Sequence, residues 1–228
     1  MKQLLKTAFE IAMAVRENQP PALGNLDKVK IIYDAEADVE GFIGKSGDII
    51  IIAFMGTESF RDVITDAKFW KKKIPYDNMN SNIRVHAGFI DAYKRDKVRG
   101  EIHRTIQEWG GASVYRIYGH SYGGALATLC AVDVQFNFSS EIALIIFGCP
   151  RVGNPAFSRS FNKRVPNVIR VINGSDLVTK LPPFWCFYKH IGGYYHIGKG
   201  DTFWNFLGHC LSDHLPKSYQ NAIDSMPE

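Results

Sequence analysis

The chain has 228 residues, of which 46% are hydrophobic and 22% are charged, and its formal net charge is +4. This composition excludes an intrinsically disordered chain, and so small a positive excess is far from the concentrated basic face of a nucleic-acid-binding protein. The length fits one α/β domain, so we expect a single domain over residues 1–228 and no nucleic acid among its partners.

The N-terminal segment MKQLLKTAFEIAMAVRENQPP has apolar residues at helical spacing and predicts an amphipathic helix that ends before Pro20 and Pro21. Charged residues interrupt the segment and no small-residue cleavage site follows it, unlike a secretory signal. We therefore expect a cytoplasmic location by default, or a secreted one if a native leader precedes this sequence. No run of about 18 apolar residues occurs, so no membrane span is expected.

Beyond this helix the sequence alternates between strand and helix patterns. Two antiparallel strands are predicted over 29–34 and 38–43, and the apolar run 48–54 predicts a strand that is buried on both faces. Residues 58–84 show little periodicity. The later predictions are helix 87–109, strand 113–118, helix 122–136, strand 142–147, helix 154–163, strand 167–172, strand 188–197 and helix 214–225. Such alternation is typical of an α/β fold with a mostly parallel sheet.

Three polar segments follow predicted strands: MGTES after 48–54, GHSYG after 113–118 and NGSD after 167–172. In parallel sheets the chemistry lies beyond the carboxyl ends of the strands, so we expect these segments to meet at one edge. The pentapeptide GHSYG matches G-x-S-x-G between a predicted strand and helix. There a nucleophilic serine stands on a sharp turn that leaves no room for flanking side chains. Ser121 is therefore the candidate nucleophile.

The segment IYGHSYGGALATL (117–129) resembles the nucleophile region of the class 3 lipases, the family of the fungal triacylglycerol lipases. Four further segments resemble family blocks in the same order: IIAFMGTES (51–59), VHAGFIDAY (85–93), IIFGCPRVGNPAF (145–157) and VINGSDLVTKLPP (171–183). Together the matches cover about residues 50–215. The resemblance implies one α/β-hydrolase domain with a Ser-Asp-His triad. Met55 departs from the family, which usually has arginine there, and the chain is short beside the fungal enzymes.

A serine hydroxyl becomes nucleophilic when a histidine accepts its proton and a carboxylate orients that histidine. In α/β-hydrolases the chain order is serine, acid, histidine. Asp176 follows the predicted strand 167–172 and lies in a family block, so it is the candidate acid, with Asp201 as the alternative.

Four histidines follow Asp176 and could serve as the base: His190, His196, His209 and His214. His190 and His196 lie in a segment that resembles a structural strand of the family. SDHLPKSY (212–219) resembles the family's D-H-x-x-Y, and we therefore choose His214 over His209. His120 is interpreted as a packing residue of the serine turn.

Ester cleavage places negative charge on the carbonyl oxygen, which backbone N–H groups stabilise. One donor is expected from the residue after the nucleophile, Tyr122, and the resemblance implies Thr57 as the other. Residues 58–80 stand at the place of the family's lid and carry the apolar side chains Phe60, Phe69 and Trp70. Phe184 and Trp185 form a further aromatic patch, which either lines an acyl pocket or packs structurally.

The four cysteines contain no C-x-x-C pair, so neither a zinc site nor a redox motif is indicated, and we expect no metal and no cofactor. The sequence therefore predicts a serine carboxylic ester hydrolase, specifically a lipase that acts on acylglycerols at a lipid–water interface. The alternatives are a phospholipase A1, a feruloyl-type esterase and an inactive lipid- or protein-binding module.

Overall fold

The computed structural model describes residues 1–14, 26–56, 69–74, 78–138, 141–199 and 211–227, and the structural statements below concern these residues. The central element is a seven-stranded sheet with the strand order β1-β2-β3-β6-β7-β8-β9. Its strands are β1 (Lys28–Asp34), β2 (Val39–Ser46), β3 (Ile49–Phe54), β6 (Val114–His120), β7 (Glu141–Phe147), β8 (Asn167–Asn173) and β9 (Tyr194–Ile197).

The sheet is antiparallel at one edge and parallel in the rest. The pairs β1·β2 and β2·β3 are antiparallel, and every pair from β3 to β9 is parallel. The carboxyl ends of β3, β6, β7 and β8 therefore reach the same edge of the sheet. This confirms the mostly parallel α/β architecture that the alternation of patterns predicts.

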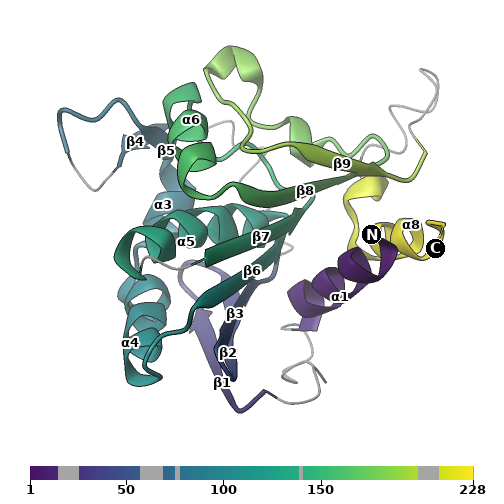
Figure 1. Ribbon diagram of the computed structural model, residues 1–228. Coiled ribbons are helices and arrows are strands. Elements are labelled where there is room, and N and C mark those ends of the chain that lie inside the picture. The colour runs from purple at the N-terminus through teal and green to yellow at the C-terminus, as the bar shows by residue number, and fades with distance from the viewer. Residues whose placement is uncertain (15–25, 57–68, 75–77, 139–140, 200–210, 228) are drawn as a thin grey trace.

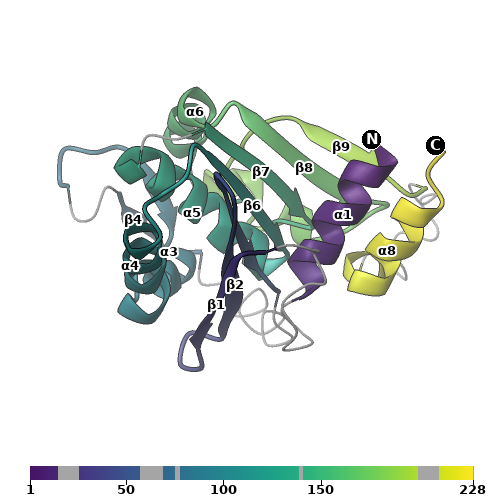
Figure 2. The same cartoon turned by 60° about the horizontal axis from the view of Figure 1, so that its bottom comes forward.

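Helices cover both faces of the sheet (Figures 1 and 2). One face carries α1 (Lys2–Met13) and α8 (Pro216–Asp224), which contact each other. The other face carries α3 (Ala87–Tyr93), α4 (Glu101–Glu108), α5 (Tyr122–Phe138) and α6 (Pro155–Arg164). Each face has its own cluster of buried apolar side chains, one that includes Phe9 and Ile223 and one that includes Leu126 and Phe161.

Helix α5 lies at the centre of the second layer, and its first twelve residues are almost entirely buried. A helix that is apolar on all sides has to be enclosed by other elements. Its N-terminus directly follows β6, so the sequence that forms this buried helix also fixes where the turn at Ser121 stands.

The predicted helix over 87–109 is wrong as one continuous helix. The chain forms α3, a π-helical turn over Asp96–Gly100 and then α4. Between α3 and the π-helical turn, Arg95 leaves the helical conformation, with a ψ of 146°. Its guanidinium forms an ion pair with Asp34, at 2.6 Å from Nε to Oδ2, and the Asp34 side chain is completely buried. This tertiary contact with the end of β1 competes with the helical pattern.

The predicted strand over 188–197 is too long, because only β9 belongs to the sheet. Gly192 has a φ of 52°, which interrupts an extended strand. Before it, Lys189 donates its backbone N–H to Gly153 instead of pairing with β8.

The predicted helix over 214–225 begins later than expected, at Pro216. Proline is favoured in the first helical turn, because a backbone N–H there has no acceptor within the helix and proline lacks this group. His214 therefore lies in the short 3-10 helix Ser212–His214 before α8.

The weakly periodic segment 58–84 also contains regular structure that the sequence did not indicate. Within its described part, β4 (Lys71–Lys73) pairs antiparallel with β5 (Arg84–His86). Among the described residues between β8 and α8 there are three short 3-10 helices, at Val178–Lys180, Phe184–Cys186 and Ser212–His214. Among the helices of the described ranges, none combines the length and apolar character needed to cross a membrane.

Candidate active site

Ser121 stands on the sharp turn between β6 and α5. Its φ is 56°, in the left-handed region that non-glycine residues rarely adopt, as expected for a nucleophile elbow. The Ser121 N–H donates to the carbonyl oxygen of Phe147 in the neighbouring strand, at 2.9 Å. A Cβ atom at Gly119 would lie 2.4 Å from the Gly123 oxygen, and one at Gly123 would lie 2.2 Å from the Phe54 oxygen. The turn therefore excludes side chains at both positions, as the motif predicts.

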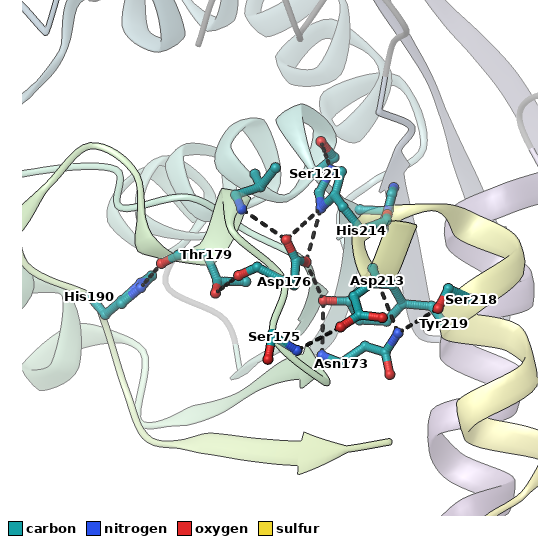
Figure 3. A network of polar contacts seen from close by, with 12 residues as sticks. Ser121, Asn173, Ser175, Asp176, Thr179, His190, Asp213, His214, Ser218 and Tyr219 are labelled. Atoms are coloured by element: carbon teal, nitrogen blue, oxygen red, sulfur yellow. Dashed lines mark hydrogen bonds and ion pairs between the residues drawn. The ribbon is translucent and has the colours of Figure 1, made fainter. Parts of the chain in front are cut away.

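His214 reaches Ser121 from the other end of the chain. Its Nε2 lies 2.7 Å from the Ser121 Oγ, within hydrogen-bonding distance (Figure 3). Its Nδ1 lies 2.9 Å and 3.0 Å from the two carboxylate oxygens of Asp176. When Nδ1 carries the proton and donates it to this carboxylate, Nε2 is left as the acceptor for the serine hydroxyl. The arrangement can thus transfer the serine proton to the imidazole.

Asp176 is completely buried, and several donors surround its carboxylate. Besides His214, the backbone N–H of Val178 donates to Oδ1 at 2.9 Å, and the phenol of Tyr219 donates to Oδ2 at 2.7 Å (Figure 3). A buried carboxylate needs such partners to remain ionised. Burial and the neighbouring Asp176 raise the pKa of Tyr219 well above its ordinary value, so the phenol keeps its proton and acts as a donor.

His120 contacts both the imidazole ring and the backbone of His214. The two rings stack with their centroids 5.0 Å apart, and the His120 Nε2 lies 3.1 Å from the His214 carbonyl oxygen. Burial lowers the pKa of His120 to about 3, so its ring is neutral and its Nε2–H can donate to that carbonyl. His120 therefore packs at the serine turn, as predicted, and it also anchors the backbone of His214.

The loop that carries His214 is fastened to the end of β8. Asn173 donates from its side-chain Nδ2 to the Asp213 carbonyl oxygen and to the Ser218 Oγ, both at 2.9 Å. The Asp213 carboxylate in turn accepts the Ser175 N–H at 2.8 Å. These contacts place the residue before the candidate base against the strand that leads to Asp176 (Figure 3).

Gly148, at the end of β7, leaves the space in which Asp176 and His214 meet. A Cβ atom there would lie 2.9 Å from the His214 Cε1 and 3.0 Å from the Asp176 Oδ2, and its φ is 57°. Sequence reasoning did not identify Gly148, Asn173, Asp213 or Tyr219 as part of the site. A signal existed for Asp213 and Tyr219, which belong to the SDHLPKSY segment, and for Asn173, which opens the NGSD segment.

Several predicted site residues lie outside the described part of the structure. They are Thr57, Phe60, the alternative acid Asp201 and the alternative base His209. Tyr122 is the first residue of α5, where helix geometry directs backbone N–H groups away from the helix. Met55, at the position where the family usually has arginine, is buried in the apolar cluster beneath α1.

Three of the predicted aromatic side chains lie at the surface. Trp70, Phe184 and Trp185 are 72%, 67% and 68% exposed, and Phe69 is half-buried. The segment of Phe69 and Trp70 adjoins the segment that follows Phe184 and Trp185, because the Tyr188 phenol donates to the carbonyl oxygen of Phe69 at 3.2 Å. Within the described ranges, the ring stacked on His214 is that of His120 and none of these aromatic rings.

We predict that Tyr219→Phe lowers kcat by about tenfold and leaves KM unchanged. The substitution keeps the ring but removes one hydrogen bond to the Asp176 carboxylate, and a bond to a charged group contributes roughly 1.5–3 kcal/mol. Steady-state kinetics on a soluble ester measures the effect. Tyr33→Phe, at a phenol that is 58% exposed on β1, is the matched control. An unchanged kcat would show that the phenol does not position the acid.

We also predict that the protein loses stability when the pH falls from 7 to 5.5. Burial lowers the pKa of His86 to about 4 and that of His120 to about 3, from 6.5. The unfolded chain therefore binds more protons in this range, and stability that is complete above pH 6.5 is lost as the pH falls. The loss is roughly 1.3 kcal/mol for each histidine.

Urea unfolding at the two pH values measures this loss. The His86→Phe variant should lack the part of the pH-dependent stability loss that comes from His86, because phenylalanine does not titrate. His196→Gln is the control, since His196 is exposed, and its pH dependence should match that of the wild type. Equal unfolding free energies at both pH values would contradict the prediction.

Comparisons with known proteins identify the family of this chain. The family model "Lipase (class 3)" matches residues 51–185. A lipase of Rhizomucor miehei is 35% identical over 200 residues, which cover 85% of this chain and 53% of the relative. Phospholipase A(1) DAD1 of Arabidopsis thaliana is 34% identical over 149 residues, which cover 58% of this chain and 33% of the relative. The chain thus spans about half, or less, of the length of these relatives.

A solved structure gives the same result for the fold. The structure titled as a triacylglycerol lipase with a serine protease triad as its catalytic centre superimposes with a TM-score of 0.68 at 28% identity. The superposition covers 85% of this chain and 78% of that one. The fold is therefore that of the α/β-hydrolases, and the chain belongs to the class 3 lipase family.

Proposed function

We propose that this chain is a serine carboxylic ester hydrolase, and specifically a lipase that hydrolyses acylglycerols through an acyl-enzyme intermediate. The observation that carries the proposal is the 2.7 Å contact between the His214 Nε2 and the Ser121 Oγ, with Asp176 on the other ring nitrogen. A structural neighbour whose title names a serine protease triad as the catalytic centre of a triacylglycerol lipase also supports it.

In the proposed reaction the Ser121 oxygen attacks the ester carbonyl carbon while His214 accepts the hydroxyl proton. Asp176 stabilises the resulting imidazolium but does not take its proton. His214 then gives the proton to the departing alcohol, and the acyl group stays on Ser121. A water molecule attacks this second ester, again with His214 as the base, and releases the carboxylic acid. Each proton removed from a nucleophile is thus returned to a leaving group.

The negative charge on the carbonyl oxygen is proposed to be held by backbone N–H groups of Tyr122 and Thr57. The place of Tyr122 at the start of α5 supports its role, because the N-terminus of a helix favours negative charge. The proposal for Thr57 rests on the family resemblance. The turn before it is close to the nucleophile, since a Cβ atom at Gly56 would lie 2.8 Å from the Ser121 Cβ.

The exposed aromatic patch of Trp70, Phe184, Trp185 and Phe187 supports a substrate presented by a lipid surface. Each of these side chains is at least two-thirds exposed, which is costly in water but favourable at a membrane interface. The segment 58–80 is proposed as the lid. Its described end at Trp70 lies beside Tyr188, whose phenol is 3.4 Å from the Trp70 carbonyl oxygen.

A phospholipase A1 activity is the second candidate, because one of the relatives reported above carries that name. It uses the same triad and differs in the substrate, which the surface around the site selects. Hydrolysis of triolein and of phosphatidylcholine, measured side by side, separates the two.

Fluorophosphonate labelling tests the proposed class of reaction. An active serine hydrolase should be labelled on Ser121 and should hydrolyse esters in a panel from two to eighteen acyl carbons. The preferred chain length in that panel would distinguish a lipase from a feruloyl-type or short-chain esterase. A protein that is neither labelled nor active on any ester of the panel would be a binding module, and the proposal would be wrong.

We predict that the double substitution Phe184→Ser/Trp185→Ser lowers activity on a triolein emulsion by about tenfold and leaves soluble esters unaffected. Two exposed rings then no longer enter the lipid, and a tenfold loss of surface binding corresponds to about 1.4 kcal/mol, less than the value of one fully buried side chain. Tyr33→Ser, at an exposed aromatic residue on β1, is the control. Equal losses on emulsion and soluble ester would assign the two rings to the acyl pocket instead.

A further inference from the structure

A cavity lies in the helical layer, away from Ser121, Asp176 and His214. It has a volume of about 290 Å³ and is enclosed by α3, α5, α6 and the ends of the β4–β5 connection. Figure 1 shows these helices on the face of the sheet opposite α1 and α8. The wall is mainly apolar and includes Ile74, Ile90, Leu129, Val132, Phe136 and Phe161.

The cavity does not belong to the candidate active site. Helix α5 contributes lining residues from Leu129, near its middle, to Asn137, close to its C-terminus, whereas Ser121 precedes its first residue. With a rise of 1.5 Å per residue, Leu129 lies about 12 Å along the helix from Ser121, and Phe136 about 22 Å. The two sites are thus at opposite ends of the same helix.

The charged groups of the cavity leave one positive charge in excess. Two guanidinium groups and one carboxylate line it: Arg99, Arg164 and Asp133. Arg99 and Asp133 form an ion pair at 2.9 Å, and Asp133 also accepts from Tyr93 at 2.8 Å. These contacts neutralise the Asp133 carboxylate inside the wall.

Arg164 is the remaining cation, at the C-terminal end of α6. Its guanidinium lies 5.6 Å from the centre of the Phe136 ring and donates to the Gln135 side chain at 3.3 Å. Neither partner is anionic, and in the described part of the chain no carboxylate forms an ion pair with Arg164. Phe136 is 64% exposed, so a cation and an aromatic ring stand together at the mouth of an apolar cavity.

We propose that this cavity is a binding site for a medium-chain fatty acid, with the aliphatic chain among the helices and the carboxylate on Arg164. An apolar cavity of about 150 Å³ holds benzene, so about 290 Å³ accommodates a ligand of about twelve non-hydrogen atoms. Decanoate has this size. A planar guanidinium is also the group that best matches a carboxylate. The site depends only on the cavity and its charge, whether or not Ser121 hydrolyses esters.

Isothermal titration calorimetry with sodium decanoate, below its micelle concentration and without any ester, tests the proposal. We expect saturable binding to the wild type. Arg164→Gln should weaken decanoate binding by about tenfold, since it removes the charge-assisted contact. Arg159→Gln, an exposed arginine of α6 that does not line the cavity, should change the affinity less than about twofold.

Two further measurements locate the ligand. Decanol, which has the same chain but no charge, should bind wild type and Arg164→Gln equally. Val132→Phe, which fills the cavity, should abolish binding of both ligands, and its melting temperature shows whether it is folded. The charge comparison does not depend on that variant. Decanoate that fails to saturate the wild type, or that binds Arg164→Gln as tightly as the wild type, overturns the proposal.

Discussion

Replacing Ser121 by alanine is expected to lower kcat by about 10⁶-fold, with little change in stability. The substitution removes the oxygen that attacks the ester, and His214 cannot act without it. Ser121 is only 3% exposed, but alanine is smaller than serine and therefore fits at this position. The remaining rate acceleration over the uncatalysed reaction comes from substrate binding and oxyanion stabilisation. Hydrolysis of a p-nitrophenyl ester measures the loss, and fluorophosphonate labelling should disappear with it.

The control for this experiment is Ser113→Ala, which lies just before the opposite end of the same strand, β6. Ser113 is exposed, and its backbone N–H donates to Asp48 at 3.0 Å, a contact that the substitution keeps. This variant should retain wild-type activity and labelling. Ester turnover by Ser121→Ala at more than about a hundredth of the wild-type rate would exclude Ser121 as the nucleophile.

Replacing Asp176 by asparagine is expected to lower kcat by about 10⁴-fold and to leave KM nearly unchanged. The carboxylate accepts hydrogen bonds on both oxygens, from His214 Nδ1–H and Val178 N–H at Oδ1 and from Tyr219 O–H at Oδ2. An amide has only one oxygen, so its NH₂ group must face one of these donors. Facing His214, it would place the imidazole proton on Nε2, where the ring can no longer accept from Ser121.

Asp133→Asn is the matched control, because Asp133 is also a buried carboxylate with several donors but lies far from the triad. It is 8% exposed and accepts from Tyr93 and Arg99. Its substitution should reduce the free energy of unfolding by about 1–3 kcal/mol without a large change in kcat. The comparison separates the loss of a buried charge from the loss of catalysis. Similar kcat values for both variants would rule out an orienting role for Asp176.

The sequence was most informative where one local pattern decides both the structure and the chemistry. The apolar run 48–54 predicted strand β3, because residues buried on both faces leave little alternative to the centre of a sheet. The turn at Ser121 was predicted from the glycines of GHSYG, because flanking side chains would not fit there, and the structure gives Ser121 a φ of 56°.

The sequence was less informative where distant contacts compete with local preference. The helical pattern over 87–109 gave no sign of the break at Arg95, because that break depends on Asp34, some sixty residues earlier. Gly148 likewise appears unremarkable in the sequence. Only the folded chain shows that the Asp176 and His214 side chains occupy the space where its Cβ would be.

By itself the sequence determined the alternation of strands with helices and the position of the turn at Ser121, and it indicated Asp176 and His214 as the candidate acid and base. Tertiary structure decided how these groups are held: Tyr219 on the carboxylate, His120 beneath the imidazole, and Asn173 fastening the loop of His214. It also decided that Trp70, Phe184 and Trp185 are exposed and that a cavity opens beside the C-terminal part of α5. The physical reason is that hydrophobic periodicity acts over a few neighbouring residues, whereas these contacts join side chains that only the closed sheet brings together.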